Sequence, residues 1–336
     1  MTTMITTTSS PPLLCSFLSS KQFLLKPSVS LYLPHSPKPK PLLNPFSAKP
    51  LLPQTRSTNS RTILCFASRR KPVELAKASP DDSLRRVFQI ALWIAEGVYI
   101  LWLFLLPYAP GDPVWAISSE TVNYLVGLSL NFFFILPFMN IVGIHLIEAP
   151  VLHPMSEGLF NFVIAWTLMF APLLYTDRRR DRYKGSLDVL WGLQMFLTNT
   201  FLIPYMAIRL NNADDVSGPS KRSKLGSLMT SGASYVGLIG GITCVLSILW
   251  SLYGRTDANF GGIAERSEFL VGFFGSERLA YAFIWDICLY MIFQPWLVGD
   301  NLQNVQEDKV VLVNYLRYIP VVGLVAYLLC LESKEV

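Results

Sequence analysis

The sequence predicts an all-α protein, a polytopic transmembrane helix bundle of six or seven spans that follows a cleavable transit peptide. Of the 336 residues, 51% are hydrophobic and only 15% are charged, whereas about 25% are charged in an average soluble domain. Apolar runs long enough for a helix to cross a bilayer core of about 30 Å recur along the chain. A soluble protein with the same runs would have too little polar surface to cover them.

The first 65 residues form a separate compositional segment. They are rich in Ser, Thr, Pro and Leu and contain no acid, since the first one is Glu74. The opening MTTMITTTSS is hydroxylated and uncharged, which favours a plastid transit peptide over an Arg-rich mitochondrial one. We therefore expect residues 1–65 to be removed after import and residues 66–85 to form a stub before the membrane. The alternative is an ordinary disordered tail.

Seven apolar windows are candidates for membrane spans. The third window is the shortest and could be re-entrant, and Pro137 could kink or split the second, so the expected number of spans is six or seven. The polar stretch 211–229 is predicted to be a flexible linker between a first membrane half, 86–210, with about four spans and a second half, 230–331, with about three. The windows are residues 86–108, 122–147, 158–175, 186–208, 230–253, 277–298 and 310–331.

The distribution of basic residues conflicts with seven simple spans. Arg85 and Arg86 precede the first window, so the positive-inside rule places the start of the first span on the positive side of the membrane. Seven consecutive crossings would then put the basic segment 177–184 on the opposite side. Either one window does not cross the membrane or the rule is weakly obeyed.

Ionisable side chains within apolar windows are candidates for function, because each costs several kcal/mol to place in a membrane. Glu96 lies in the middle of the first window and Asp286 lies about nine residues into the sixth. Either could act as a proton donor or bind a ligand. The alternative is a structural role, in which Glu96 bonds a neighbouring helix and Asp286 pairs with a cation such as Arg278 or Arg317.

Three residues between the second and third windows form a weak candidate metal site. His145 and Glu148 are three residues apart and would share a helical face, and His153 follows them. Pro150 interrupts the helix between them, so an interfacial helix end is the alternative interpretation.

Several other classes of function are disfavoured. Beyond residue 70 the acids outnumber the bases, so we expect no nucleic-acid partner. Cys244, Cys288 and Cys330 lie singly in apolar runs and predict neither a disulfide framework nor a zinc cluster. The sequence contains no P-loop, dinucleotide fingerprint or hydrolase motif, and we expect no cofactor.

The stretch from residue 273 to residue 329 resembles the end of a small plastid membrane family that is required for neoxanthin formation in abscisic acid synthesis, the ABA-deficient type. Where that family carries a His and a downstream Asp in this helix, the present chain has Trp285 and Tyr290. The matching positions are Ser276, Glu277, Leu279, Ala280, Ala282, Ile284, Asp300, Leu302, Pro320 and Gly323.

This resemblance implies an activity in xanthophyll metabolism that needs no cofactor. Isomerising an epoxide to an allenic alcohol requires an acid that protonates the epoxide oxygen and a base that removes a proton. Asp286, Glu277 and Glu96 are the carboxyl groups expected to supply them. The expected partners are the lipid bilayer, an apolar isoprenoid ligand and other membrane proteins.

Two functions of other classes remain open. A small-solute or ion carrier of the plastid membrane would explain both the carboxyl groups within the windows and the prolines that kink them. A non-catalytic factor that assembles or organises membrane complexes would explain the lack of a strong motif. The sequence predicts a multi-pass plastid membrane protein without distinguishing the envelope from the thylakoid.

Overall fold

The computed structural model describes residues 80–212, 222–256 and 258–332. Within these ranges the chain forms helices and no strand, which confirms the all-α class. The predicted transit peptide 1–65 and residues 66–79 of the predicted stub lie outside the described residues. From Pro80 onward the stub is already helical.

Four helices are long and apolar enough to cross a membrane, or five if the bent pair formed by residues 119–141 counts as one span. These helices indicate a membrane-embedded protein. The expected six or seven spans are not reached. The four helices are α1 (Pro80–Ile100), which the π-helical turn η1 (Leu101–Leu105) extends, α4 (Pro154–Thr176), α8 (Ala233–Tyr253) and α10 (Arg278–Asp300).

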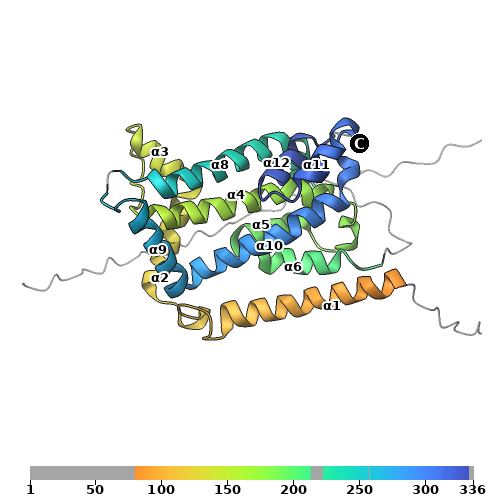
Figure 1. The fold of residues 1–336 in the computed structure, drawn as a ribbon, viewed down its shortest axis with the longest axis horizontal. Coiled ribbons are helices and arrows are strands. Elements are labelled where there is room, and N and C mark those ends of the chain that lie inside the picture. The colour runs from red at the N-terminus through yellow and green to blue at the C-terminus, as the bar shows by residue number, and fades with distance from the viewer. Residues whose placement is uncertain (1–79, 213–221, 257, 333–336) are drawn as a thin grey trace, which may run out of the picture. The chain divides into compact units, whose positions relative to one another are not determined.

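Helix α4 is the centre of the bundle and packs most extensively against α8 (Figure 1). Almost every residue of α4 is buried, and a buried ion pair holds each of its ends. Glu157 pairs with Arg255 at 2.6 Å near the start, and Asp177 pairs with Arg209 at 2.8 Å just after the end. Glu157 and Asp177 lie at opposite ends of α4, so these ion pairs anchor the helix at both ends.

A single hydrophobic core contains residues of both predicted membrane halves. Trp166 of α4 and Leu202 belong to the same buried cluster as Tyr290 of α10 and Leu324. Helix α7 (Lys224–Ser231) begins inside the predicted linker 211–229. Residues 213–221 of that stretch lie outside the described residues.

Helix α1 has its polar side chains on the side that faces the protein. Leu92, Glu96, Tyr99 and Leu103 recur at intervals of three or four residues and are buried, as one face of a helix requires. The opposite face is apolar and exposed, and includes Ile94 at 61%. A soluble helix would show the reverse pattern, so this arrangement suits a helix whose outer face contacts lipid.

The window 122–147 is broken and lies across one end of the bundle. It forms α2 (Ser119–Leu130), the turn η3 (Phe132–Phe134) and α3 (Ile135–Ile141). The Tyr124 hydroxyl forms a hydrogen bond with the Ser156 hydroxyl, and the Phe133 backbone amide donates to Asn161 Oδ1. The ring of Phe138 packs against that of Trp250. These partners lie in the first two turns of α4 and the last turn of α8, so the segment crosses both helices near one end (Figure 1).

The window 186–208 forms a re-entrant hairpin from the other end of the bundle. Helices α5 (Leu187–Leu197) and α6 (Asn199–Ile208) meet at Thr198, whose φ of 42° breaks the helix. Asp188 near the start of α5 accepts a hydrogen bond from Tyr175, and Arg209 after α6 pairs with Asp177. Both partners lie at the end of α4, so the hairpin begins and ends on the same side.

The window 310–331 is also a hairpin, made of α11 (Val310–Leu316) and α12 (Val322–Leu329). Its two ends meet where the Gln306 amide donates to the Cys330 carbonyl at 3.0 Å. At the break, Gln294 of α10 donates to the Arg317 and Ile319 carbonyls, each at 2.9 Å. Hydropathy reports how long an apolar segment is, but it does not report whether the chain crosses the membrane or turns back. The sequence therefore predicts a single span here. Broken backbone is tolerated at membrane depth because buried side chains such as Gln294 satisfy it.

The remaining described elements are short connections and one helix at the end of the bundle that α2 and α3 cross. Helix α9 (Ile263–Ser276) lies at that end and leads into α10 (Figure 1). The connections are the single turns η2 (Val114–Ala116), η4 (Arg180–Arg182), η5 (Leu302–Asn304) and η6 (Glu307–Lys309).

The two ends of the bundle differ in charge. We call the end that carries α2, α3 and α9 the acidic end, and the other the basic end. Burial, and after it the positive charges of Arg179 and Arg85, lower the pKa of Arg182. Arg85 belongs to the start of α1 and Arg182 to the basic loop after α4, so these two segments lie close together. Described cations of the basic end include Arg85, Arg86, Arg178, Arg179, Arg180, Arg182, Lys184, Arg209, Arg222 and Lys224.

This arrangement resolves the conflict with the positive-inside rule. The window 122–147 does not cross along the bundle, so the basic loop returns to the side on which α1 begins. The described acids of the other end outnumber its described cations, which are Arg255, Arg266 and Arg278, and Arg255 is paired with Glu157. The rule therefore predicts that the basic end faces the compartment from which the protein inserts.

We expect cysteines introduced at Ser119 and at Lys184 to lie on opposite sides of the membrane. In a background without the five native cysteines, a membrane-impermeant maleimide should label only one of the two variants in sealed vesicles. Seven consecutive spans would place both residues on the same side. Equal labelling of both variants in sealed vesicles would therefore contradict the hairpins described here.

Candidate functional site

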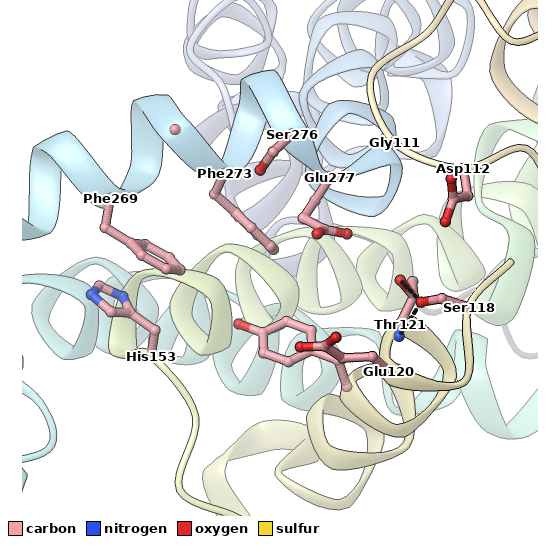
Figure 2. Close-up of a pocket in the computed structure, with 12 residues that line it drawn as sticks. Gly111, Asp112, Ser118, Glu120, Thr121, His153, Phe269, Phe273, Ser276 and Glu277 are labelled. Carbon is pink, nitrogen blue, oxygen red and sulfur yellow. Dashed lines mark hydrogen bonds between the residues drawn. The ribbon is translucent and has the colours of Figure 1, made fainter. Parts of the chain in front are cut away.

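A cavity of about 560 Å³ lies at the acidic end of the bundle (Figure 2). Its walls come from the loop after α1, the first turns of α2, the residue that precedes α4 and the last turns of α9. The loop approaches closely because Gly111 has a φ of 73° and leaves no room for a Cβ, which would lie 2.5 Å from the Arg278 amide nitrogen. Four segments of the chain thus meet around one space.

Three carboxyl groups line the cavity, those of Asp112, Glu120 and Glu277. Figure 2 shows Glu120 and Glu277 entering it from opposite walls. Burial raises the pKa of Glu277, and the negative charges of Asp112 and Glu120 raise it further. A carboxyl group with a raised pKa can serve as an acid, and the carboxyl groups beside it place a candidate base in the same site.

The opposite part of the cavity is aromatic. Phe269 and Phe273 stack with their ring centres 5.5 Å apart, and Tyr124 packs against Phe273 at 5.9 Å. His153 stacks on Phe269 with the ring centres 3.5 Å apart. The cavity therefore offers an apolar surface for a ring next to the carboxyl groups.

His153 has a structural function at the start of α4. Its Nδ1 accepts a hydrogen bond from the Met155 amide at 3.2 Å, which caps the helix. Burial and then the positive charge of Arg266 lower the pKa of His153 to about 4. The imidazole is consequently neutral near pH 7 and keeps its role as an acceptor.

The predicted metal site is not assembled. His145 and Glu148 line a different hollow beside α3 and α8, while His153 caps α4 and stacks on Phe269. Within the described ranges, no group of three His, Cys, Asp or Glu side chains could hold a metal ion. These residues are not brought together because residues 145–153 are not one helix, so a spacing of three residues places no side chains on a shared face.

Asp286 lies in the bundle interior and does not line the cavity. Its carboxyl oxygen Oδ1 accepts hydrogen bonds from Thr198 at 2.7 Å, Asn199 at 2.7 Å and Tyr99 at 3.1 Å. Neither Arg278 nor Arg317, the structural partners considered from the sequence, contacts it. The guanidinium of Arg278 instead donates to backbone carbonyls at the end of α1, including Leu103 and Gly111.

Glu96 is also separate from the cavity. It is 6% exposed, and its Oε2 has no hydrogen-bond partner among the described residues. Glu96 precedes Tyr99 by one turn of α1, and is therefore nearer to Asp286 than to Glu277. The structure does not bring the three predicted catalytic residues together. Glu277 lines the cavity, whereas Glu96 and Asp286 lie inside the bundle, with Asp286 about 13 Å along α10 from Glu277.

Asp112, Glu120 and Tyr124 were not predicted from the sequence as site residues. Asp112 and Glu120 lie in a polar joint between two apolar windows, where acids are common. Only the folding of α2 across the bundle end brings them to Glu277. No protein-family model, curated protein or solved structure matches this chain.

Proposed function

We propose that this protein is an integral plastid membrane protein that isomerises a bilayer-soluble isoprenoid by cofactor-free acid–base catalysis in the cavity at the acidic end. The observation that carries the proposal is the position of Glu277. Its carboxyl group, with a raised pKa, faces a cavity that also holds two further carboxyl groups and an aromatic wall. Asp286 and Glu96, which do not line the cavity, have no catalytic part in this mechanism.

The proposed reaction leaves the composition of the substrate unchanged. Glu277 donates a proton to the oxygen of an epoxide, and the carbon–oxygen bond breaks. Glu120 or Asp112, as a carboxylate, removes a proton from the adjacent chain carbon, and the electron pair of that bond forms the new double bond of an allenic alcohol. The acid and the base are then restored by exchange of one proton with water.

The location of the cavity supports a substrate of this kind. The cavity lies where α4 and α10 begin, at the end of the membrane-embedded bundle. A long isoprenoid with an oxygenated ring places its apolar chain among the lipids and its polar ring near the membrane surface. Ser276 and Glu277, which line the cavity, are two of the positions at which the sequence resembles the neoxanthin-related plastid family.

A plastid location belongs to the same proposal. It is supported by the acid-free leader and by the concentration of cations at one end of the bundle, which the positive-inside rule would place in the stroma. Loss of roughly the first 65 residues from the mature protein is part of this expectation.

Filling the cavity tests the proposal. Gly272 lines it and an added Cβ would meet no atom within 4 Å, whereas Gly275 on the same helix has equal space but does not line the cavity. We expect Gly272→Phe to reduce conversion of an epoxy-xanthophyll at least tenfold, and Gly275→Phe to leave it unchanged. Conversion is measured by chromatography with the full chain in lipid nanodiscs.

Two results would reject this function. One is the absence of conversion by the wild-type protein in nanodiscs that contain the epoxide substrate. The other is equal conversion by the Gly272→Phe variant and the wild type, because an occupied cavity cannot hold the substrate ring.

A further inference from the structure

The tip of the α5–α6 hairpin meets α10 in the interior of the bundle. Asp286 is the ninth residue of the 23-residue α10, and it is 1% exposed. The hairpin breaks at Thr198, and there the side chains of Thr198 and Asn199 both donate to Asp286 Oδ1. A discontinuous helix thus faces a buried carboxyl group at about half the depth of the spanning helices.

Several polar atoms around this tip have no partner among the described residues. Asn199 and Gln194 are fully buried, yet Asn199 Oδ1 and both amide atoms of Gln194 make no hydrogen bond, and neither does Thr200 Oγ1. The Asn199 amide nitrogen bonds Asp286, so the free oxygen of the same amide lies beside that carboxyl group. An unpartnered buried polar atom costs about 1–3 kcal/mol, and such atoms are usually rare. Their concentration at one joint indicates an occupant.

The charge of Asp286 defines what this occupant must be. Among the described residues, the hydrogen-bond partners of the carboxyl group, Tyr99, Thr198 and Asn199, are all neutral, and none is a cation. A carboxylate that is buried without a counter-ion is strongly disfavoured. It must therefore be protonated or be neutralised by a cation that the chain does not itself supply.

We propose that the hairpin tip binds a monovalent alkali cation, with the Asp286 carboxylate and the free side-chain oxygens of Asn199, Gln194 and Thr200 as the surrounding oxygen ligands. Hard cations prefer such ligands. One carboxylate among neutral oxygens matches a single positive charge, and the lack of a cluster of three acidic or imidazole side chains in the described chain argues against a divalent ion. Broken helices at mid-membrane commonly form Na⁺ sites in transporters.

This site is independent of the proposed isomerisation. It is formed by α5, α6 and α10 in the interior, whereas the cavity lies at the end of the bundle. A cation or a proton can neutralise Asp286, but not both together, so the two compete. Cation binding at this depth is the step that a carrier would require.

The experiment measures thermal unfolding of the full chain in detergent at constant ionic strength, with NaCl or KCl replacing N-methyl-D-glucamine chloride. We expect the unfolding midpoint to rise saturably by about 3 °C or more with one of the alkali ions. At lower pH a higher cation concentration should be needed for half of the rise, because protons compete for Asp286.

Asp286→Asn removes the charge but keeps an Oδ1 that can accept the same three hydrogen bonds, so it should fold and lose the cation-dependent rise. Asp308→Asn is the control, because Asp308 is exposed at the surface, and it should retain the rise. Thr200→Val, which removes one proposed ligand, should raise the half-saturating concentration about tenfold. It also provides the test if Asp286→Asn does not accumulate.

The proposal is rejected if neither ion shifts the midpoint of the wild type between pH 6 and 8. It is also rejected if Asp286→Asn shows the same rise as the wild type, because the cation would then bind elsewhere. Cavity-filling variants such as Gly272→Phe should keep the rise even if they lose isomerase activity, which separates the two sites.

Discussion

Arg209→Met is expected to lower the free energy of unfolding by about 3–5 kcal/mol. The Arg209 guanidinium donates to both carboxyl oxygens of Asp177, at 2.8 and 2.9 Å, and both side chains are fully buried. The Met side chain would fill similar space but leave the carboxylate without its cation. Tyr205 and Asn301 would still donate to Asp177, but they carry no charge.

The pH dependence of this effect follows from Asp177. Burial alone would raise the pKa of Asp177, but the hydrogen bonds and charge of Arg209 outweigh it and hold the pKa below its usual value. Because the folded-state pKa is depressed, the stabilisation is present above the unfolded pKa of about 4 and is lost as the pH falls through the lower folded value. The difference between wild type and variant should shrink over the same acid range.

Arg179→Met is the matched control. Arg179 lies two residues after Asp177 in the loop that follows α4. Its side chain is one-third exposed, and its Nη1 is 3.7 Å from Asp300 Oδ2. An exposed pair of this kind contributes about 0–1 kcal/mol. Unfolding of the two variants in a fixed detergent gives the comparison. Equal stabilities of both variants would show that the buried pair has no special role.

Glu277→Gln should reduce the rate constant for isomerisation by about 10²–10⁴-fold, the usual contribution of a general acid. The Gln side chain has nearly the same shape but cannot protonate an epoxide. In the wild type, activity should fall as the pH rises above the raised pKa of Glu277, because the acid then loses its proton.

The control for this prediction is Glu268→Gln. Glu268 lies on α9 but is exposed and does not line the cavity, so its loss should change neither the rate nor the pH profile. Both rates are measured by chromatography in nanodiscs. A Glu277→Gln variant with wild-type turnover would exclude Glu277 as the acid, even if the cavity binds the substrate.

The helices could be predicted from the sequence but their directions could not. Each of the seven apolar windows is largely helical, and the four that form single helices match closely the predicted bounds. The breaks at Thr198 and Val321 have positive φ values in residues that rarely adopt them. Asp286 accepts a hydrogen bond from the Thr198 side chain, and Gln294 accepts one from the Val321 backbone amide. Both partners are distant in sequence, so no local pattern predicts these contacts.

The small residues of α8 were more informative. Ala233, Gly237 and Gly241 recur at intervals of four, which predicts close approach of another helix. In the structure an added Cβ at Gly237 would lie 3.0 Å from Leu328, and one at Gly241 would lie 2.9 Å from Val325. The spacing thus predicted close packing correctly, but the partner, α12, could not be identified from it.

Of the residues that line the candidate site, His153 and Glu277 are named as site residues from the sequence, and only Glu277 in a catalytic role. Glu277 follows from the resemblance to the plastid family, since it is one of the matching positions in the stretch 273–329. Asp112 and Glu120 come from a different part of the chain and reach Glu277 only because α2 lies across the bundle end. Glu96 and Asp286 were singled out correctly as buried carboxyl groups, but burial did not reveal which of them faces a cavity.

The hairpin tip also constrains the order in which the chain can be assembled during synthesis. The bonds from Thr198 and Asn199 to Asp286 connect residues 88 and 87 positions apart, and α8 and α9 are made between them. While the ribosome is still producing those helices, the tip has no carboxyl partner at membrane depth. The α5–α6 segment must therefore wait near the membrane surface or be protected by an insertion factor. A nascent chain arrested before residue 278 should consequently leave this hairpin accessible to protease, and release of α10 should close it.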